Sequence, residues 1–192
     1  MDSKTLILKQ LDEAHAMETA LVTNLSAHIA MTTDDDYRAL LERHLKETTA
    51  QVSAIDRRRR ALGRAGGRGI VSMTLGTARD LVGQALVLTK GPIDGIRTAD
   101  QHERMLKNVK DECATEALEI ATYDALETLA KAAGDKVTAK LAADHRRQEE
   151  RMLEDLRATI AALSVDTYES RTGESARPQV KAAATRKVAA VS

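Results

Sequence analysis

The stretch that decides the fold is QHERMLKNVKDECATEALEIATYDALETLAKAAG, residues 101–134. At 100° per residue, one narrow face of a helix over this stretch collects six side chains. These are Met105, Val109, Glu112, Glu116, Glu119 and Tyr123. Three carboxylates therefore lie on the face that the helix must bury, and a buried carboxylate without a compensating cation is costly. The stretch predicts a helix whose acids are held by protein cations or by metal ions.

The composition is typical of helices that pack through aliphatic side chains. The 192 residues include no Phe, no Trp and three Tyr, and 29 Lys and Arg balance 29 Asp and Glu. Because the formal net charge is zero, no overall field favours nucleic acid or an acidic partner. The length suits one domain with an appendage. We therefore expect an all-α protein.

The chain shows no signal for secretion or for a membrane. Cys113 is the single cysteine and cannot form an internal disulfide. The start, MDSKTLILKQLDEAH, has an acid at position 2 and an apolar run of three residues, which is too short for a signal peptide. No stretch approaches the roughly 18 apolar residues that a membrane span needs. We expect a cytoplasmic protein.

Three further stretches, residues 3–31, 35–62 and 136–163, are predicted to form amphipathic helices, the first capped by Ser3. Each has polar residues on or beside its apolar face: Glu18 in the first, His44 and Glu47 in the second, His145 and Glu149 in the third. Any one of them alone is explained by a histidine of the core or by a carboxylate at the edge of the face. Together they raise the question of a shared site.

The remaining segments set the domain organisation. Arginines at 57–60 suit the negative end of a helix dipole, with a phosphate or nucleic-acid patch as the alternative. Residues 70–90 are expected to form a short extra helix in a long crossover, or a helix that meets a partner subunit. Residues 164–192 show no helical period and are basic and Ala-rich. We expect a bundle over 1–163 and a flexible tail over 164–192.

The combined inventory is that of a ferritin-like di-metal bundle, which uses one Glu from each of two helices and a Glu/His pair from each of the others. The candidate ligands are Glu18, His44, Glu47, Glu112, Glu116, Glu119, His145 and Glu149. Four carboxylates neutralise two divalent cations, and carboxylate oxygens with one imidazole per metal suit iron or manganese. The prediction is a four-helix bundle with two metal ions.

Several segments resemble the YciF-like branch of the ferritin-like superfamily, which comprises bacterial proteins associated with stress. They are LDEAHAMETAL, HLKETTAQ, ATEALEIATYDALETLA and QEERM, and the resemblance spans roughly residues 5–162. It implies Glu18, Glu47, Glu116 and Glu149 as ligands, with His44 and His145 as ligands or supporting groups. In ferritins the histidine follows the acid by three residues. Here it precedes the acid, by three residues on one helix and by four on another, and both spacings keep the pair on one face.

The predicted function is metal binding and oxidation, or peroxide handling, in a stress response. An activity like that of a di-iron oxidase or peroxidase would bring dioxygen or peroxide to the metals. Tyr123, one turn beyond Glu119, is the candidate catalytic residue, and an ordinary buried phenol is the alternative. The rival function is that of a non-enzymatic helical-bundle stress or interaction protein. Attachment of its tail to nucleic acid or to a shell protein is a further alternative. A homo-oligomer, a dimer, is expected in either case.

Overall fold

The computed structural model describes residues 1–64 and 101–189, and this part of the chain is helical with no strand. Its helices are α1 (Ser3–Met31), α2 (Asp35–Arg64), α4 (Gln101–Ala132), α5 (Lys136–Thr172) and α6 (Pro178–Ala189). The all-α prediction is therefore confirmed. The predicted helix over 70–90 lies outside the described residues. None of the described helices has a stretch long and apolar enough to cross a membrane.

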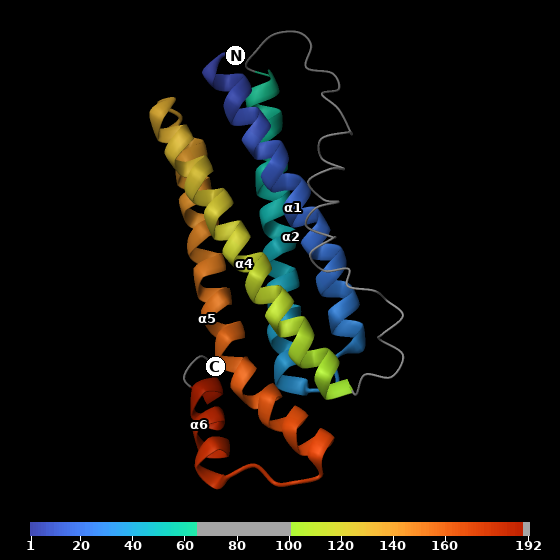
Figure 1. Cartoon of the computed structure of the whole chain (residues 1–192). Helices are drawn as coiled ribbons and strands as arrows, with labels where there is room; N and C mark the ends of the chain where they lie inside the picture. The colour runs from blue at the N-terminus through green and yellow to red at the C-terminus, as the bar shows by residue number, and fades with distance from the viewer. Residues whose placement is uncertain (65–100, 190–192) are drawn as a thin grey trace.

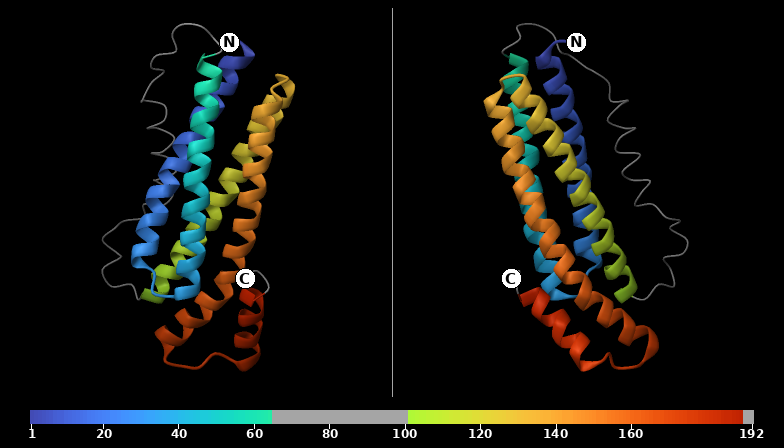
Figure 2. Two further views of the ribbon diagram at one scale, coloured as in Figure 1. Left: turned by 180° about the vertical axis from the view of Figure 1, so that it is seen from behind. Right: turned by 60° about the vertical axis from the view of Figure 1, so that its left-hand side comes forward.

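The first four of these helices form two antiparallel hairpins that pack against each other (Figures 1 and 2). α1 pairs with α2 and α4 pairs with α5, while α1 also contacts α4 and α2 contacts α5. The end of α2 and the start of α4 lie at opposite ends of the bundle, so these two helices run in the same direction (Figure 1). Residues 65–100 are the connection, which agrees with the predicted long crossover.

Local signals explain where the helices begin and turn. Asp2, rather than the predicted Ser3, caps α1 by accepting a hydrogen bond of 2.7 Å from the Thr5 amide. Asp135 caps α5 in the same way, with 3.0 Å to the amide of Thr138. Gly134 adopts φ 71° between α4 and α5, a conformation that glycine reaches without steric cost.

The end of the chain differs from the prediction. α5 continues to Thr172 instead of stopping near residue 163, and residues 178–189 form α6, which packs on α5. Ala184 is the buried side chain of α6. The sequence pattern missed these helical turns because alanine gives little contrast between an apolar and a polar face. The division into a bundle and a separate tail remains a prediction.

Two apolar clusters occupy the ends of the bundle. The upper cluster, at the end that holds the N-terminus in Figure 1, contains Ile7, Leu11, Ala14, Ile55, Tyr123, Leu126, Ala130, Ala139 and Ala142. The lower cluster contains Leu21, Leu25, Tyr37, Leu40, Leu41, Met105, Val109, Met152, Leu156 and Leu163. Every one of the four long helices passes from one cluster to the other. The buried residues between the clusters are polar, and we call them the middle layer: Glu18, His44, Thr48, Gln51, Glu112, Glu116, Glu119, His145 and Glu149.

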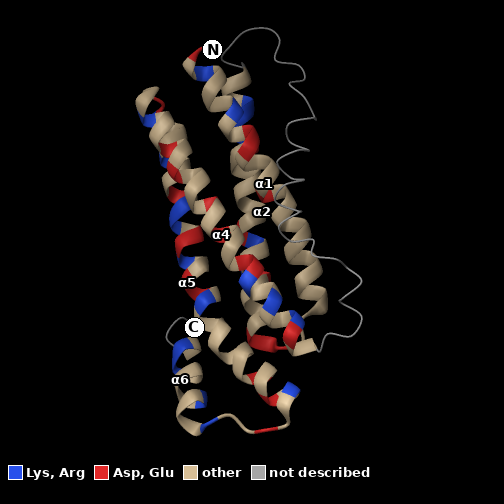
Figure 3. Ribbon diagram, viewed as in Figure 1, with Lys and Arg blue, Asp and Glu red and all other residues tan. Residues whose placement is uncertain are grey.

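Lys, Arg, Asp and Glu residues are spread along the helices (Figure 3). Three arginines of the predicted run form ion pairs: Arg58 with Asp135, Arg59 with Asp12 and Arg60 with Asp56. The first two pairs join α2 to the α4–α5 turn and to α1. These three arginines therefore serve contacts within the bundle and not an unpaired basic patch.

Candidate metal centre

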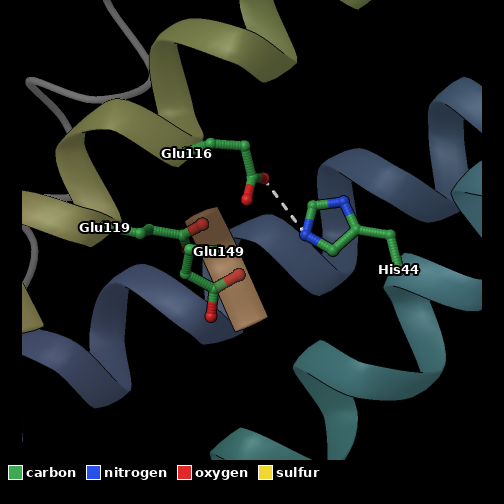
Figure 4. Close-up of side chains that lie close together, drawn as sticks. All are labelled: His44, Glu116, Glu119 and Glu149. Carbon is green, nitrogen blue, oxygen red and sulfur yellow. Dashed lines mark ion pairs between the residues drawn. The ribbon is translucent and has the colours of Figure 1, made fainter. Parts of the chain in front are cut away.

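Four predicted ligands converge in the middle layer from three helices (Figure 4). They are His44 of α2, Glu116 and Glu119 of α4, and Glu149 of α5. Each can offer one ligand atom such that all four atoms lie within 4.8 Å of one another. Metal–ligand bonds of about 2.0–2.5 Å put opposite ligands roughly 4–5 Å apart, so the spacing is that of ligands around one ion.

The ligand atoms of this group have few partners within the protein. All four residues are at most 2% exposed. Both oxygens of Glu116 and Glu119 and both nitrogens of His44 are buried without a hydrogen-bond partner. The contact drawn as a dashed line in Figure 4 joins His44 Nε2 to Glu116 Oε1 at 3.1 Å, but it lacks hydrogen-bond geometry. Buried polar atoms are almost always paired, so this concentration makes the four residues a candidate site for a bound ion.

Burial dominates the protonation of the group. It raises the pKa of Glu116 and of Glu119 well above the ordinary value, and the surrounding carboxylates add to the effect. It raises the pKa of Glu149 to about 7, although a hydrogen bond from Gln51 opposes the shift. Burial also lowers the pKa of His44 to about 4. Without a cation, the group therefore favours neutral carboxyls beside a neutral imidazole.

Glu18, Tyr123 and His145 form a hydrogen-bonded chain at the upper edge of the group. The Tyr123 hydroxyl donates to Glu18 Oε1, and His145 Nδ1 lies 3.2 Å from the hydroxyl oxygen. The two rings meet edge to face, with centroids 5.1 Å apart. Because the hydroxyl proton goes to Glu18, Nδ1 of His145 is the donor to the hydroxyl oxygen. Glu18 Oε2 is buried without a partner.

The inward orientation of the acids is confirmed. Glu18, Glu116 and Glu149 are at most 2% exposed, whereas the neighbouring Glu150 is exposed and pairs with Arg146. This is the contrast that their positions around the helix predict.

Four predicted ligands lie outside the group of four: Glu18, Glu47, Glu112 and His145. Glu47 is half-buried at the flank of Glu149, whose pKa its charge raises. Glu112 is buried one turn before Glu116 and contacts Nδ1 of His28. His145 faces Tyr123 at the upper edge. Their ligation of a metal stays a prediction.

The sequence reasoning missed Gln51 and His28. Gln51 donates from its amide to Glu149 and, at 3.0 Å, to Gln148. Gln51 lies seven residues after His44, which places the two residues 20° apart around the helix. An assignment of the buried face of α2 from the helical period would therefore have included Gln51. His28 lies three residues after the buried Leu25 on α1. Because the helical repeat is between three and four residues, either His28 or Ile29 can follow Leu25 on the buried face.

The donor set fits a divalent cation. Carboxylate oxygens with one imidazole suit hard or intermediate metals such as iron and manganese. A cation would partner the buried oxygens and nitrogens that the protein leaves unpaired, and it would compensate the carboxylate charges. Within the group of four, the ion-pair contact of Glu116 is with His44, whose imidazole is neutral at pH 7 because burial lowers its pKa to about 4.

Comparison with known families gives a match over residues 3–73 and 93–169 to the family described as Domain of unknown function (DUF892). The chain belongs to the DUF892 family. No curated protein matches it significantly. The matched residues include all the helices that bring ligands to the group of four.

Solved structures share the fold of this DUF892 chain. A protein of Xanthomonas campestris pv. campestris is 26% identical with a TM-score of 0.66, and the match covers 88% of this chain and 99% of that one. YcfI of Rhodopseudomonas palustris is 21% identical with a TM-score of 0.65, covering 82% and 94%. The stress protein YciF of E. coli is 21% identical with a TM-score of 0.58, covering 91% and 99%.

Proposed function

We propose that the protein binds two iron or manganese ions in its middle layer and uses them to oxidise metal or to handle dioxygen or peroxide. One observation carries the proposal. Imidazole and carboxylate atoms from three helices meet within 4.8 Å, and most of them have no hydrogen-bond partner in the protein. Such a set is costly to keep in a core unless a ligand compensates it.

His44, Glu116, Glu119 and Glu149 would hold the first ion. Glu18 and Glu119 would hold the second, because Oε2 of Glu18 and both oxygens of Glu119 are buried without a hydrogen-bond partner. The charges of Glu18 and Glu116 both raise the pKa of Glu119, which supports a role for Glu119 towards both ions. The four carboxylates of this set balance two divalent cations.

A bound pair of reduced ions would supply the electrons for dioxygen or peroxide. Tyr123 contributes a proton held at a defined atom, since its hydroxyl donates to Glu18 and receives a hydrogen bond from His145. Burial and the charge of Glu18 raise the pKa of Tyr123 well above its ordinary value. The phenol is therefore protonated at neutral pH and positioned to donate beside the metals.

The likeness to the stress protein YciF of E. coli supports a role in stress. Metal-centred removal of peroxide, or storage of oxidised metal, are functions that a stressed cell requires. This part of the proposal rests on a neighbour and on the chemistry of the site.

Elemental analysis of protein purified without chelator tests the proposal. We expect about two iron or manganese ions per chain, as in other four-carboxylate bundles. Chelation should lower the melting temperature, because a ligand that binds only the folded state stabilises it. Metal-free protein together with a melting curve that chelator leaves unchanged would contradict the proposal.

The second candidate function is a non-enzymatic scaffold. It is favoured by the raised pKa values of the buried acids, because neutral carboxyls let the bundle fold without any ion. The same chelator experiment separates the two functions.

A further inference from the structure

The wall between α1 and α4 holds a metal-ligating pair that the group of four does not use. Nδ1 of His28, on α1, contacts Oε1 of Glu112, on α4. The His28 side chain is 17% exposed and that of Glu112 is 2% exposed. His28 is therefore partly accessible from the surface, whereas Glu112 lies in the interior.

Glu112 continues this line towards the metal centre. Its second oxygen, Oε2, is buried without a hydrogen-bond partner. Glu116 follows four residues later on the same face of α4, at a rise of about 6 Å along the helix axis. The Glu112 charge contributes to the raised pKa of Glu116 and of Glu119, so the three carboxylates influence one another.

Two other approaches to the centre offer different side chains. Between α2 and α5, the amide of Gln51 spans Glu149 and Gln148 and offers neutral groups. The nearest outer acid there is Glu47. Towards the upper cluster, Tyr123 lies over Glu18 and is itself fully buried.

We propose that His28 and Glu112 form the entry port through which a divalent cation reaches the centre. The inference rests on the proposed metal binding and adds a route to it. The imidazole and Glu112 Oε1 capture the ion at the surface, and Glu112 Oε2 passes it to Glu116. A carboxylate in a partly enclosed wall raises the local cation concentration and the rate of association. Glu112 thus acts before the centre and not as one of its final ligands.

Stopped-flow mixing of chelator-treated full-length protein with Co²⁺, followed by its visible absorbance, tests the port. Release is measured by mixing the loaded protein with excess EDTA. His28→Gln keeps a donor for Glu112 but removes the imidazole ligand, and Glu112→Gln removes the charge. We expect both variants to slow uptake and release by a similar factor, about tenfold. Because a port alters both rates together, the Co²⁺ affinity and stoichiometry at equilibrium should match those of wild type.

Two variants serve as controls. His15→Gln changes another half-buried histidine of α1, and Glu150→Gln removes an exposed acid of α5 that pairs with Arg146. Both should load at the wild-type rate. Unchanged or faster loading in His28→Gln and Glu112→Gln would overturn the port. Equally slow loading in Glu150→Gln, or weaker equilibrium binding in Glu112→Gln, would also overturn it. A wild-type protein that binds no Co²⁺ would overturn the proposed metal binding itself, and the port with it.

Discussion

The same four helices form the middle layer and the two apolar clusters, but the side chains buried in these regions are polar in the first and mainly apolar in the others. The clusters bury aliphatic side chains, which stabilise the fold in proportion to the apolar area removed from water. The middle layer buries carboxylates and imidazoles that leave many polar atoms unpaired. Stability should therefore come from the ends of the bundle, whereas the middle imposes a cost that a bound cation would offset. The predictions below test this contrast.

The largest effect on stability is expected in the lower cluster. Leu156 is fully buried there, and Leu156→Ala should lower the free energy of unfolding by about 2–5 kcal/mol because it removes buried methyl groups and leaves a cavity. Urea denaturation measures the loss, and metal stoichiometry should not change. Leu118→Ala, at a side chain that is 45% exposed, is the control and should have little effect. Equal losses at the two positions would contradict the assignment of the core.

A substitution in the middle layer should have the opposite sign in metal-free protein. Glu116→Gln replaces a carboxyl that must take up a proton when the metal-free chain folds at pH 7 with an amide that is always neutral. With chelator at pH 7 the variant should therefore be more stable than wild type, by on the order of 1 kcal/mol. The same variant should lose most of the rise in melting temperature that metal gives to wild type. Glu150→Gln is the matched control on the outer surface. Destabilised, metal-independent Glu116→Gln protein would instead show that Glu116 serves an internal ion pair.

The pH dependence should also separate the two regions. Buried carboxyls with a raised pKa keep their protons at a pH where the unfolded chain has released them. The stability of the metal-free protein should therefore fall as the pH rises above about 4.5. For Glu149, whose pKa is about 7, this loss extends up to about pH 7. His44 and His145, whose pKa values burial lowers to about 4, act in the opposite direction up to about 6.5. The affected carboxyls are Glu18, Glu116, Glu119 and Glu149. Because four carboxyls outnumber two imidazoles, the net trend is a loss.

Urea denaturation at pH 5 and pH 7.5, with chelator and with Mn²⁺, measures this trend. The stability gained from Mn²⁺ should grow with pH, since the ligands bind metal in their deprotonated form. Metal-free protein that becomes more stable from pH 5 to pH 7.5 would show that the carboxyls are not the dominant titrating groups.

The smallest effect is expected outside both regions. Truncation after Thr172 removes α6, whose buried side chain is Ala184. The loss of unfolding free energy should stay below about 1 kcal/mol, because little apolar area is uncovered. Metal binding should remain as in the full chain. A large decrease in melting temperature would show that α6 forms part of the bundle core.

The sequence predicts the bundle well because its helices are long and strongly periodic. The bounds of α1 agree with residues 3–31, and the inward position of Glu116 follows from its step of three or four from Glu112 and Glu119. The choice among candidate ligands depends on tertiary packing. Glu47 lies 60° around α2 from His44, which is enough to turn it towards the flank once α5 is in place.

Contacts between helices could not be read from the period of one helix. The pairing of His28 with Glu112 joins residues 84 positions apart, and that of Tyr123 with Glu18 joins residues 105 positions apart. A helical period assigns a face to each residue but not the height at which two helices meet. The sequence analysis therefore found most of the middle layer and missed how its members are arranged in pairs.

The two hairpins are joined in the chain only through residues 65–100, yet the candidate ligands are divided between them: Glu18 and His44 belong to one hairpin, and Glu116, Glu119 and Glu149 to the other. An ion bound by ligands from both hairpins would hold the two hairpins together non-covalently. Separate peptides spanning residues 1–64 and 101–192 would then reassemble as a split protein, with the metal concentration setting the extent of their association.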